Sequence, residues 1–223
     1  MKKYIIQAIL IFCLTTTGLF AFDSGELNRI TLVNNTGSDI WYLFLSPGDS
    51  DDWGFDILGS EYFFEDGGEL SFYIHYPDYE NEFDIMAIDE GGNPYVLYDE
   101  LISDSGEARI ILDDWDREEN LGTLEFIEIY FTNETDYEMY YLFASPGDSI
   151  MWGVDMMDDG QTLMPGEDLN LLALYYEGSF RYDIMAVDGD GDEYSFYIEY
   201  DSGEVAPNDS LGYAIEYGDL VVD

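Results

Sequence analysis

Short apolar runs that end in turn residues follow one another along the chain, and no segment keeps a helical period of apolar positions. Residues 69–76 alternate, with Leu70, Phe72 and Ile74 among those on one face. Such alternation is typical of a half-buried strand, whereas the unbroken apolar run at 40–45 is typical of a buried one. The pattern predicts strands at 27–33, 40–45, 69–76, 82–88, 95–98, 108–112, 124–132, 138–144, 169–175, 180–187, 193–200 and 211–217.

The chain contains two copies of one unit. The sequence SPGDSDDWGFD at 46–56 recurs as SPGDSIMWGVD at 145–155, an offset of 99 residues. The same offset places Asn34 on Asn133, and FDIMAID at 83–89 on YDIMAVD. A constant offset over this span leaves no net insertion, so we expect both copies to share one fold.

We therefore expect repeat 1 at 22–115, a polar linker at 116–123 and repeat 2 at 124–223. About seven short strands in each repeat favour an all-β fold of two tandem antiparallel β-sandwiches, immunoglobulin-like or similar. The pattern leaves open the strand order, and whether the two domains pack rigidly or swing about the linker.

The first 21 residues have the features of a bacterial secretory signal peptide. Lys2 and Lys3 form a basic end, an apolar segment follows, and the small residue Ala21 precedes the first acid, Asp23. A retained membrane anchor is the alternative, although the apolar run is short for a span. The one cysteine, Cys13, lies in this segment, so the mature chain has no thiol chemistry. We expect a secreted, periplasmic or cell-envelope protein without a membrane-inserted part after cleavage.

The charge is strongly acidic. Asp and Glu number 50 and Lys and Arg 6, which gives a formal net charge of −44. A field of this sign repels nucleic-acid phosphates and anionic lipid headgroups, and it attracts cations and basic proteins. It excludes nucleic acid as a partner and makes a basic protein a candidate.

The repeated motif loop has turn chemistry, because Pro47 fixes φ and Gly48 tolerates positive φ. We expect a short helical turn at 51–58, with the loop folded back so that its tryptophan plugs the end of the sandwich. The acids at 51 and 52 become Ile150 and Met151 in repeat 2, which disfavours a carboxylate binding site. The persisting residues are predicted to be structural, with the two aspartates capping backbone N–H groups: Trp53, Asp56, Trp152 and Asp155.

The turn DGDGDE at 188–193 is the candidate metal site. Asp188, Asp190 and Asp192 resemble the start of a calcium loop, because a bent backbone can direct several oxygen ligands to one ion. Glu193 stands where the helix–loop–helix calcium motif requires glycine, which excludes that type. A plain hairpin turn and a weak extracellular calcium site both remain open.

Catalytic signals are missing from the sequence. His75 is the one histidine, and no nucleophile elbow accompanies it, so we expect no enzyme, no catalytic residues and no organic cofactor. Tyrosine is abundant, with 20 residues, and many of them fall on the expected strands. An exposed aromatic face could stack on sugar rings or on a protein partner, whereas core packing is the alternative explanation.

Copy one, NNTGSDIWYLFLSPGDSDDWGFDILG followed by FDIMAIDEGGNPY, resembles a repeat found in uncharacterised secreted bacterial proteins. That repeat has N-x-T-G, a strand that ends in S-P, then W-G-x-D-x-L-G, Y-D-I and a D-x-D-G turn. The resemblance covers most of each unit, although Asp136 replaces Gly37, and Met157 replaces Leu58. It implies export and a small β domain, and no mechanism.

Together these observations predict an exported, non-enzymatic protein of two β domains with a binding or envelope role, and with calcium as a candidate stabilising ion. A basic protein or a glycan is the expected partner. The alternative is a carbohydrate-binding module that uses an exposed aromatic strand face.

Overall fold

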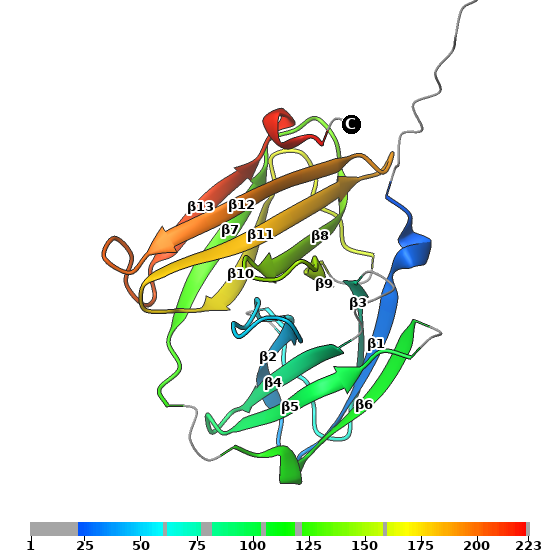
Figure 1. The fold of residues 1–223 in the computed structure, drawn as a ribbon, viewed down its shortest axis with the longest axis vertical. Coiled ribbons are helices and arrows are strands. Elements are labelled where there is room, and N and C mark those ends of the chain that lie inside the picture. Colours follow the sequence, from blue (N-terminus) through cyan, green and yellow to red (C-terminus); the bar gives the residue numbers. More distant parts are fainter. Residues whose placement is uncertain are drawn as a thin grey trace, which may run out of the picture.

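The computed structural model describes residues 22–59, 62–76, 82–103, 106–118, 122–157 and 160–221 (Figure 1). The regular elements of this part are strands and three short 3-10 helices, which confirms the predicted all-β class. Repeat 1 contains η1 (Ser24–Glu26), β1 (Asn28–Asn35), β2 (Ile40–Pro47), β3 (Glu69–His75), β4 (Glu82–Asp89), β5 (Pro94–Leu101), β6 (Glu107–Asp113) and η2 (Asp114–Asp116). Repeat 2 contains β7 (Phe126–Asn133), β8 (Met139–Pro146), β9 (Gly153–Asp155), β10 (Asp168–Leu174), β11 (Ser179–Asp188), β12 (Glu193–Asp201), β13 (Ser210–Ile215) and η3 (Tyr217–Asp219).

Each repeat is a sandwich of two three-stranded layers. Repeat 1 pairs β6-β1-β3 in one layer and β2-β4-β5 in the other, and repeat 2 pairs β13-β7-β10 and β8-β11-β12. Most neighbours are antiparallel, as predicted, but β6 runs parallel to β1 and β13 runs parallel to β7. The last strand of each repeat therefore returns beside its first strand in the same direction.

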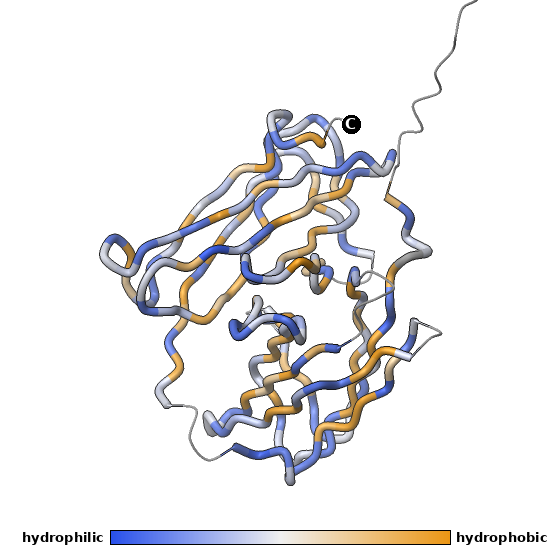
Figure 2. Tube along the Cα trace, in the orientation of Figure 1, coloured by the Kyte–Doolittle hydropathy of each residue, from blue (hydrophilic) through white to orange (hydrophobic). Residues whose placement is uncertain are grey.

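The alternating patterns place apolar side chains between the layers. In β1, Ile30 and Leu32 are fully buried while their neighbours in the strand are more exposed. Figure 2 shows apolar stretches along the strands and hydrophilic residues in many of the turns. The predicted strands and the observed ones agree because a period of two describes a sheet with one face in the core.

The repeated Asn-x-Thr triplets are structural. The Asn34 amide is buried and donates to the carbonyl oxygens of Ser38 and Phe64, both over 2.9 Å, and its Oδ1 accepts from Thr36. Asn133 makes the same contacts in repeat 2, with Tyr137, Leu163 and Thr135. Each asparagine thus satisfies backbone groups where the chain leaves the first strand of its repeat.

A continuous sheet joins the two repeats. Strand β9 pairs with β8 in its own repeat and with β3 of repeat 1, where Val154 lies opposite Ile74. The seven strands run in the order β12-β11-β8-β9-β3-β1-β6. The equivalent segment of repeat 1 makes one isolated bridge on each side, from Phe55 to Ala173 of β10 and from Asp56 to Phe44 of β2. Since an offset of 99 relates Phe55 to Val154 and Ile74 to Ala173, the seam has pseudo-two-fold symmetry.

The first residues of each repeat also pack on the other repeat. Phe126 joins the apolar cluster on the outer face of β2 and β4, together with Phe44 and Met86. Its counterpart Leu27 joins the equivalent cluster around Phe143 in repeat 2. Two reciprocal contacts of this kind cover sheet faces that an isolated repeat would expose to water.

None of the helices in the described residues is both long and apolar enough to span a membrane. The predicted signal peptide at 1–21 lies outside the described residues, as does part of the expected linker.

Candidate functional site

The motif-loop aspartates hold the loop against the neighbouring strand. Asp56 Oδ1 accepts hydrogen bonds from the backbone N–H groups of Leu43 and Leu58, over 2.9 and 3.2 Å. Asp155 Oδ1 accepts from Leu142 and Met157 in the same way. Asp56 is only 1% exposed, and burial raises its pKa to about 7 although the two backbone N–H groups oppose this shift. Both aspartates thus cap backbone N–H groups of the loop and of the neighbouring strand.

The motif-loop tryptophans lie at the junction of the repeats instead of plugging the end of a sandwich. Trp53 packs on the outer face of repeat 1 beside Phe44 and Met86, and its backbone N–H donates to the Tyr176 hydroxyl of repeat 2 over 2.7 Å. Trp152 packs on the outer face of repeat 2. The expected helical turn at 51–58 is absent from this described segment, because residues 55 and 56 form bridges across the seam and to β2.

The three aspartates of the candidate calcium turn lie in the hairpin between β11 and β12. Asp188 is buried, and its Oδ1 accepts from the backbone N–H groups of Asp190 and Asp192, both over 3.0 Å. The Tyr194 hydroxyl donates to Asp188 Oδ2 over 3.3 Å, while Asp190 and Asp192 themselves are exposed. Among the described residues, no group of three or more His, Cys, Asp or Glu is placed to hold a metal ion. Calcium binding at this turn stays a prediction.

His75 belongs to an aromatic group on the seam. Its ring lies 5.6 Å from the ring of Phe22 and 5.7 Å from that of Phe143, measured between centroids. The side chain is therefore placed among apolar rings of both repeats, which is a packing position.

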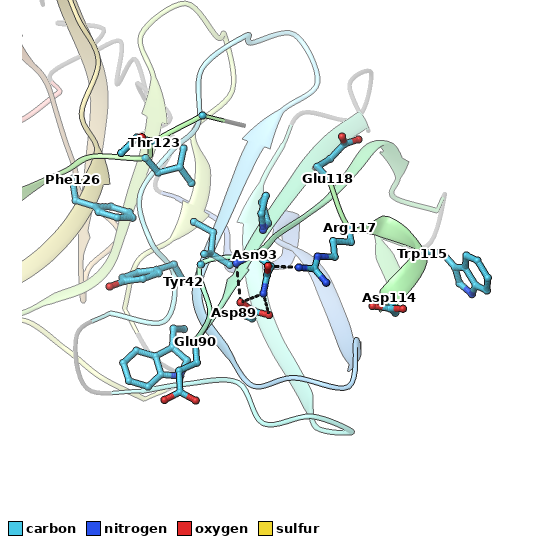
Figure 3. Close-up of a pocket in the computed structure, with 16 residues that line it drawn as sticks. Tyr42, Asp89, Glu90, Asn93, Asp114, Trp115, Arg117, Glu118, Thr123 and Phe126 are labelled. Carbon is cyan, nitrogen blue, oxygen red and sulfur yellow. Dashed lines mark hydrogen bonds between the residues drawn. The ribbon is translucent and has the colours of Figure 1, made fainter. Parts of the chain in front are cut away.

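An open groove of about 1270 Å³ lies beside repeat 1. Its walls are β2, the turn between β4 and β5, the segment after η2, and the chain that leads into β7 (Figure 3). Tyr42 forms part of one wall and is covered by Phe126, whose ring stacks on it with centroids 4.8 Å apart. Trp41 is the neighbouring aromatic residue on β2 and is 45% exposed. Trp115 is 91% exposed, and Figure 3 shows it directed away from Asn93.

A hydrogen-bonded chain of three side chains fixes the polar wall of the groove. Arg117 donates to Asn93 Oδ1, and Asn93 Nδ2 donates to both carboxylate oxygens of Asp89, over 2.9 and 2.8 Å (Figure 3). Burial disfavours the charged form of Asp89, but the hydrogen bonds from Asn93 outweigh it, so the pKa of Asp89 lies below its ordinary value. The carboxylate is therefore ionised and holds the Asn93 amide in one orientation.

These groove residues distinguish repeat 1 from repeat 2. Trp41 corresponds to Tyr140, and Asn93 corresponds to Asp192. Arg117 forms a β-bridge with Tyr95, and the equivalent bridge of repeat 2 is made by Leu220. Sequence reasoning missed all three positions as a site. The available signal was the difference between two otherwise matching copies, and Arg117 was hidden in the segment expected to be a linker.

No protein-family model matches this chain, and neither does any curated protein. Among solved structures, gamma-CGTase from alkalophilic Bacillus clarkii shows 11% identity and a TM-score of 0.30 over 86% of this chain. The match spans only 28% of that enzyme's chain. A candidate adhesin from Bacteroides ovatus shows 12% identity and a TM-score of 0.26, over 89% of this chain and 92% of its own. Similarities this weak carry no functional argument.

Proposed function

We propose that the chain is an exported, non-enzymatic binding protein that holds a neutral carbohydrate in the groove of repeat 1. One observation carries the proposal: the half-exposed indole of Trp41 lines the same groove as the fixed Asn93–Arg117 pair. A flat aromatic ring beside directional hydrogen-bonding groups is the combination that sugar rings require, since they have apolar faces and polar edges.

Arg117 supplies hydrogen-bond donors to such a ligand. A guanidinium has five N–H donors in a fixed fork, and here it is oriented by its bond to Asn93. Asn93 is itself oriented by the Asp89 carboxylate. Because the polar wall is ordered before a ligand arrives, binding loses less side-chain entropy than it would on a mobile surface.

Charge selects an uncharged ligand for this groove. Among the described residues that line the groove, Arg117 is the one cation and four residues are acidic: Asp89, Glu90, Asp114 and Glu118. The whole chain carries −44, so an anionic sugar would enter against both the local and the overall field. Neutral hydroxyl-rich ligands avoid this cost.

The state of Asp89 favours binding over hydrolysis at this position. A glycoside hydrolase needs a general acid, which is a carboxyl group with a raised pKa. The pKa of Asp89 is lowered, and its oxygens are already occupied by Asn93. Its role in the groove is therefore to position a neighbour.

The test is binding of the mature chain, from Phe22 onward, to a neutral glycan array, followed by calorimetry on the best ligand. We expect Trp41→Ala to weaken binding at least about tenfold, which corresponds to roughly 1.4 kcal/mol. Arg117→Leu, which installs the residue of repeat 2, should weaken it to a similar extent. Tyr98→Ala is the matched control, because Tyr98 is 55% exposed on β5 and does not line the groove. Absence of glycan binding, or equal affinities in Trp41→Ala and the parent chain, contradicts the proposal.

A basic protein is the second candidate partner, favoured by the net charge of −44. Attraction of this kind weakens steeply as salt rises, since the screening length falls to about 10 Å at 0.1 M. Sugar binding through stacking and hydrogen bonds changes little over the same range. A salt titration of any bound partner therefore separates the two functions.

A further inference from the structure

A second cavity, of about 440 Å³, lies on the seam between the repeats. Four aromatic residues line it: Phe72 and Tyr73 from β3 of repeat 1, and Tyr140 and Tyr141 from β8 of repeat 2. Met156 and Met157, which follow β9, are buried beside them. The volume falls within the range of roughly 300 to 1,000 Å³ that is common for small-molecule pockets.

The seam itself assembles this cavity. Strand β9 pairs with β3 on one side and with β8 on the other, which brings Tyr73 and Tyr140 to one place although they are far apart in the sequence. Both rings stay partly open to solvent at the seam, since Tyr73 is 38% exposed and Tyr140 is 45% exposed. The counterpart of Tyr73 in repeat 2 is Leu172, so the internal symmetry does not impose a tyrosine there.

The charges around the cavity are mainly negative. Asp155 is the one charged side chain among the described lining residues. Glu138 lies just behind the lining, where it accepts hydrogen bonds from Thr162 over 2.5 Å and from Tyr140 over 3.4 Å. The nearest cation shown by the hydrogen bonds is Arg29, which donates to the hydroxyl of the lining residue Ser71 over 3.3 Å. The cavity thus has three tyrosines and Asp155 in its lining and Glu138 behind it. The guanidinium of Arg29, which lies opposite Tyr73 in the β1–β3 ladder, is the opposing charge at its edge, and the two carboxylates outnumber it.

We propose that this cavity binds a small organic cation of the alkylammonium class. The face of a tyrosine ring is the negative end of its quadrupole and attracts an ammonium group, most strongly where water is excluded. Carboxylates nearby add to this attraction, and the overall field of the chain raises the local concentration of cations. A bare divalent ion fits the same walls poorly, because calcium requires six or more oxygen ligands and Asp155 is the one carboxylate among the described lining residues.

The test uses choline as the probe and 3,3-dimethyl-1-butanol as its neutral isostere, with ionic strength held constant by sodium chloride. We expect choline to bind the mature chain saturably at one site, and the isostere to bind at least tenfold more weakly. Tyr73→Leu and Tyr140→Leu should each weaken choline binding at least fivefold, because they keep the apolar bulk but remove the ring. Asp155→Asn should also weaken it, and its amide oxygen can still accept the two backbone hydrogen bonds.

Two controls separate this site from its alternatives. Tyr98→Leu removes an exposed tyrosine that lines neither cavity, and Trp41→Ala alters only the groove of repeat 1, so both should leave choline affinity unchanged. Thermal melts of each variant establish that it folds. Non-saturable choline association would show counterion accumulation only, and equal binding of the isostere would show apolar binding that does not depend on charge. Unchanged affinity in both tyrosine variants would place the bound choline elsewhere, and each of these results overturns the proposal.

Discussion

Ser50 of repeat 1 donates its hydroxyl hydrogen to Asp148 of repeat 2 over 2.6 Å, and Ser149 of repeat 2 donates to Asp49 of repeat 1 over 2.7 Å. The two contacts are images of each other under the 99-residue offset. They connect the two copies of the motif loop at the seam, so the recurrence of the SPGDS sequence reflects a contact between repeats. In this respect the chain resembles an isologous dimer whose two subunits are joined in one polypeptide.

The two repeats should unfold in a single transition, because they share the seven-stranded sheet and reciprocal apolar contacts. Ser50→Ala and Ser149→Ala should each lower the free energy of unfolding by about 1 to 2 kcal/mol, as expected for a hydrogen bond to a carboxylate. Urea unfolding followed by both tryptophan fluorescence and far-UV circular dichroism checks this. Ser210→Ala is the control, since Ser210 bonds Glu128 on the exposed surface within repeat 2. Two separated transitions would mean that the repeats are independent domains.

Gly153 at the start of β9 should be the most sensitive glycine on the seam. Its φ is +76°, and an added Cβ would lie 2.7 Å from the carbonyl oxygen of Ala144. Gly160 has a similar φ of +83° but open space around the same position. Gly160→Ala therefore measures the backbone strain alone, about 1 to 2 kcal/mol. We expect Gly153→Ala to cost at least about 1 kcal/mol more in urea unfolding, since an added carbon displaces the paired strand; equal costs would argue against a tight seam.

The strands could be predicted from the sequence, but the seam between the repeats could not. The alternation of apolar and polar residues in a segment such as 69–76 depends only on which face of the strand is buried. It is therefore the same for any strand that pairs with this segment. The pairing of Val154 with Ile74 could not be predicted in this way. The motif-loop sequence would be the same whether each loop contacts its own repeat or the other one. Pairing between segments far apart in the sequence leaves no local pattern, so the sequence predicts that Trp53 plugs the end of its own sandwich.

The groove was hidden for a different reason. The residues Trp41, Asn93 and Arg117 belong to three separate segments that only the folded sandwich brings together. Each of them has an ordinary neighbourhood in the sequence. The 99-residue offset does set Trp41 against Tyr140 and Asn93 against Asp192. Arg117 lies beyond the span that keeps this offset, and only the equivalent bridges of the structure set it against Leu220.

Asp188 should contribute to stability through its backbone hydrogen bonds, independently of any metal. Asp188→Ala removes the acceptor for two backbone N–H groups and for the Tyr194 hydroxyl, so we expect a loss of about 2 kcal/mol. Asp190→Ala is the control, because that side chain is exposed and should change the free energy of unfolding by less than about 0.5 kcal/mol. Thermal melting of the parent chain in calcium and in magnesium at one ionic strength then tests the metal. Equal shifts from both ions would mean that they only screen surface charge, whereas a calcium-selective shift that Asp190→Asn abolishes would establish the predicted site.

Asp56 should make the chain less stable as pH rises from about 4 to 7. Its pKa is about 7 in the folded chain because the carboxyl is buried, against an ordinary value of 3.8. In this window the folded chain keeps a proton that the unfolded chain has lost, so raising the pH favours unfolding. Above pH 7 the folded chain holds a buried charge, and Asp56 Oδ2 has no hydrogen-bond partner among the described atoms. The loss is on the order of a few kcal/mol.

Acid also relieves the mutual repulsion of 50 carboxylate residues, so the pH dependence of the parent chain alone cannot identify Asp56. Asp56→Asn provides the comparison, because its amide oxygen can still accept from Leu43 and Leu58 while its charge is constant. Burying the amide destabilises the variant by an amount that does not depend on pH. The unfolding free energy of the variant, relative to that of the parent chain, should therefore rise from pH 4.5 to 8. Repeating the series at higher salt weakens the surface repulsion and should leave this difference in place. Parallel pH curves for the two proteins would mean that Asp56 is ionised throughout the window and that its environment already supports the charge.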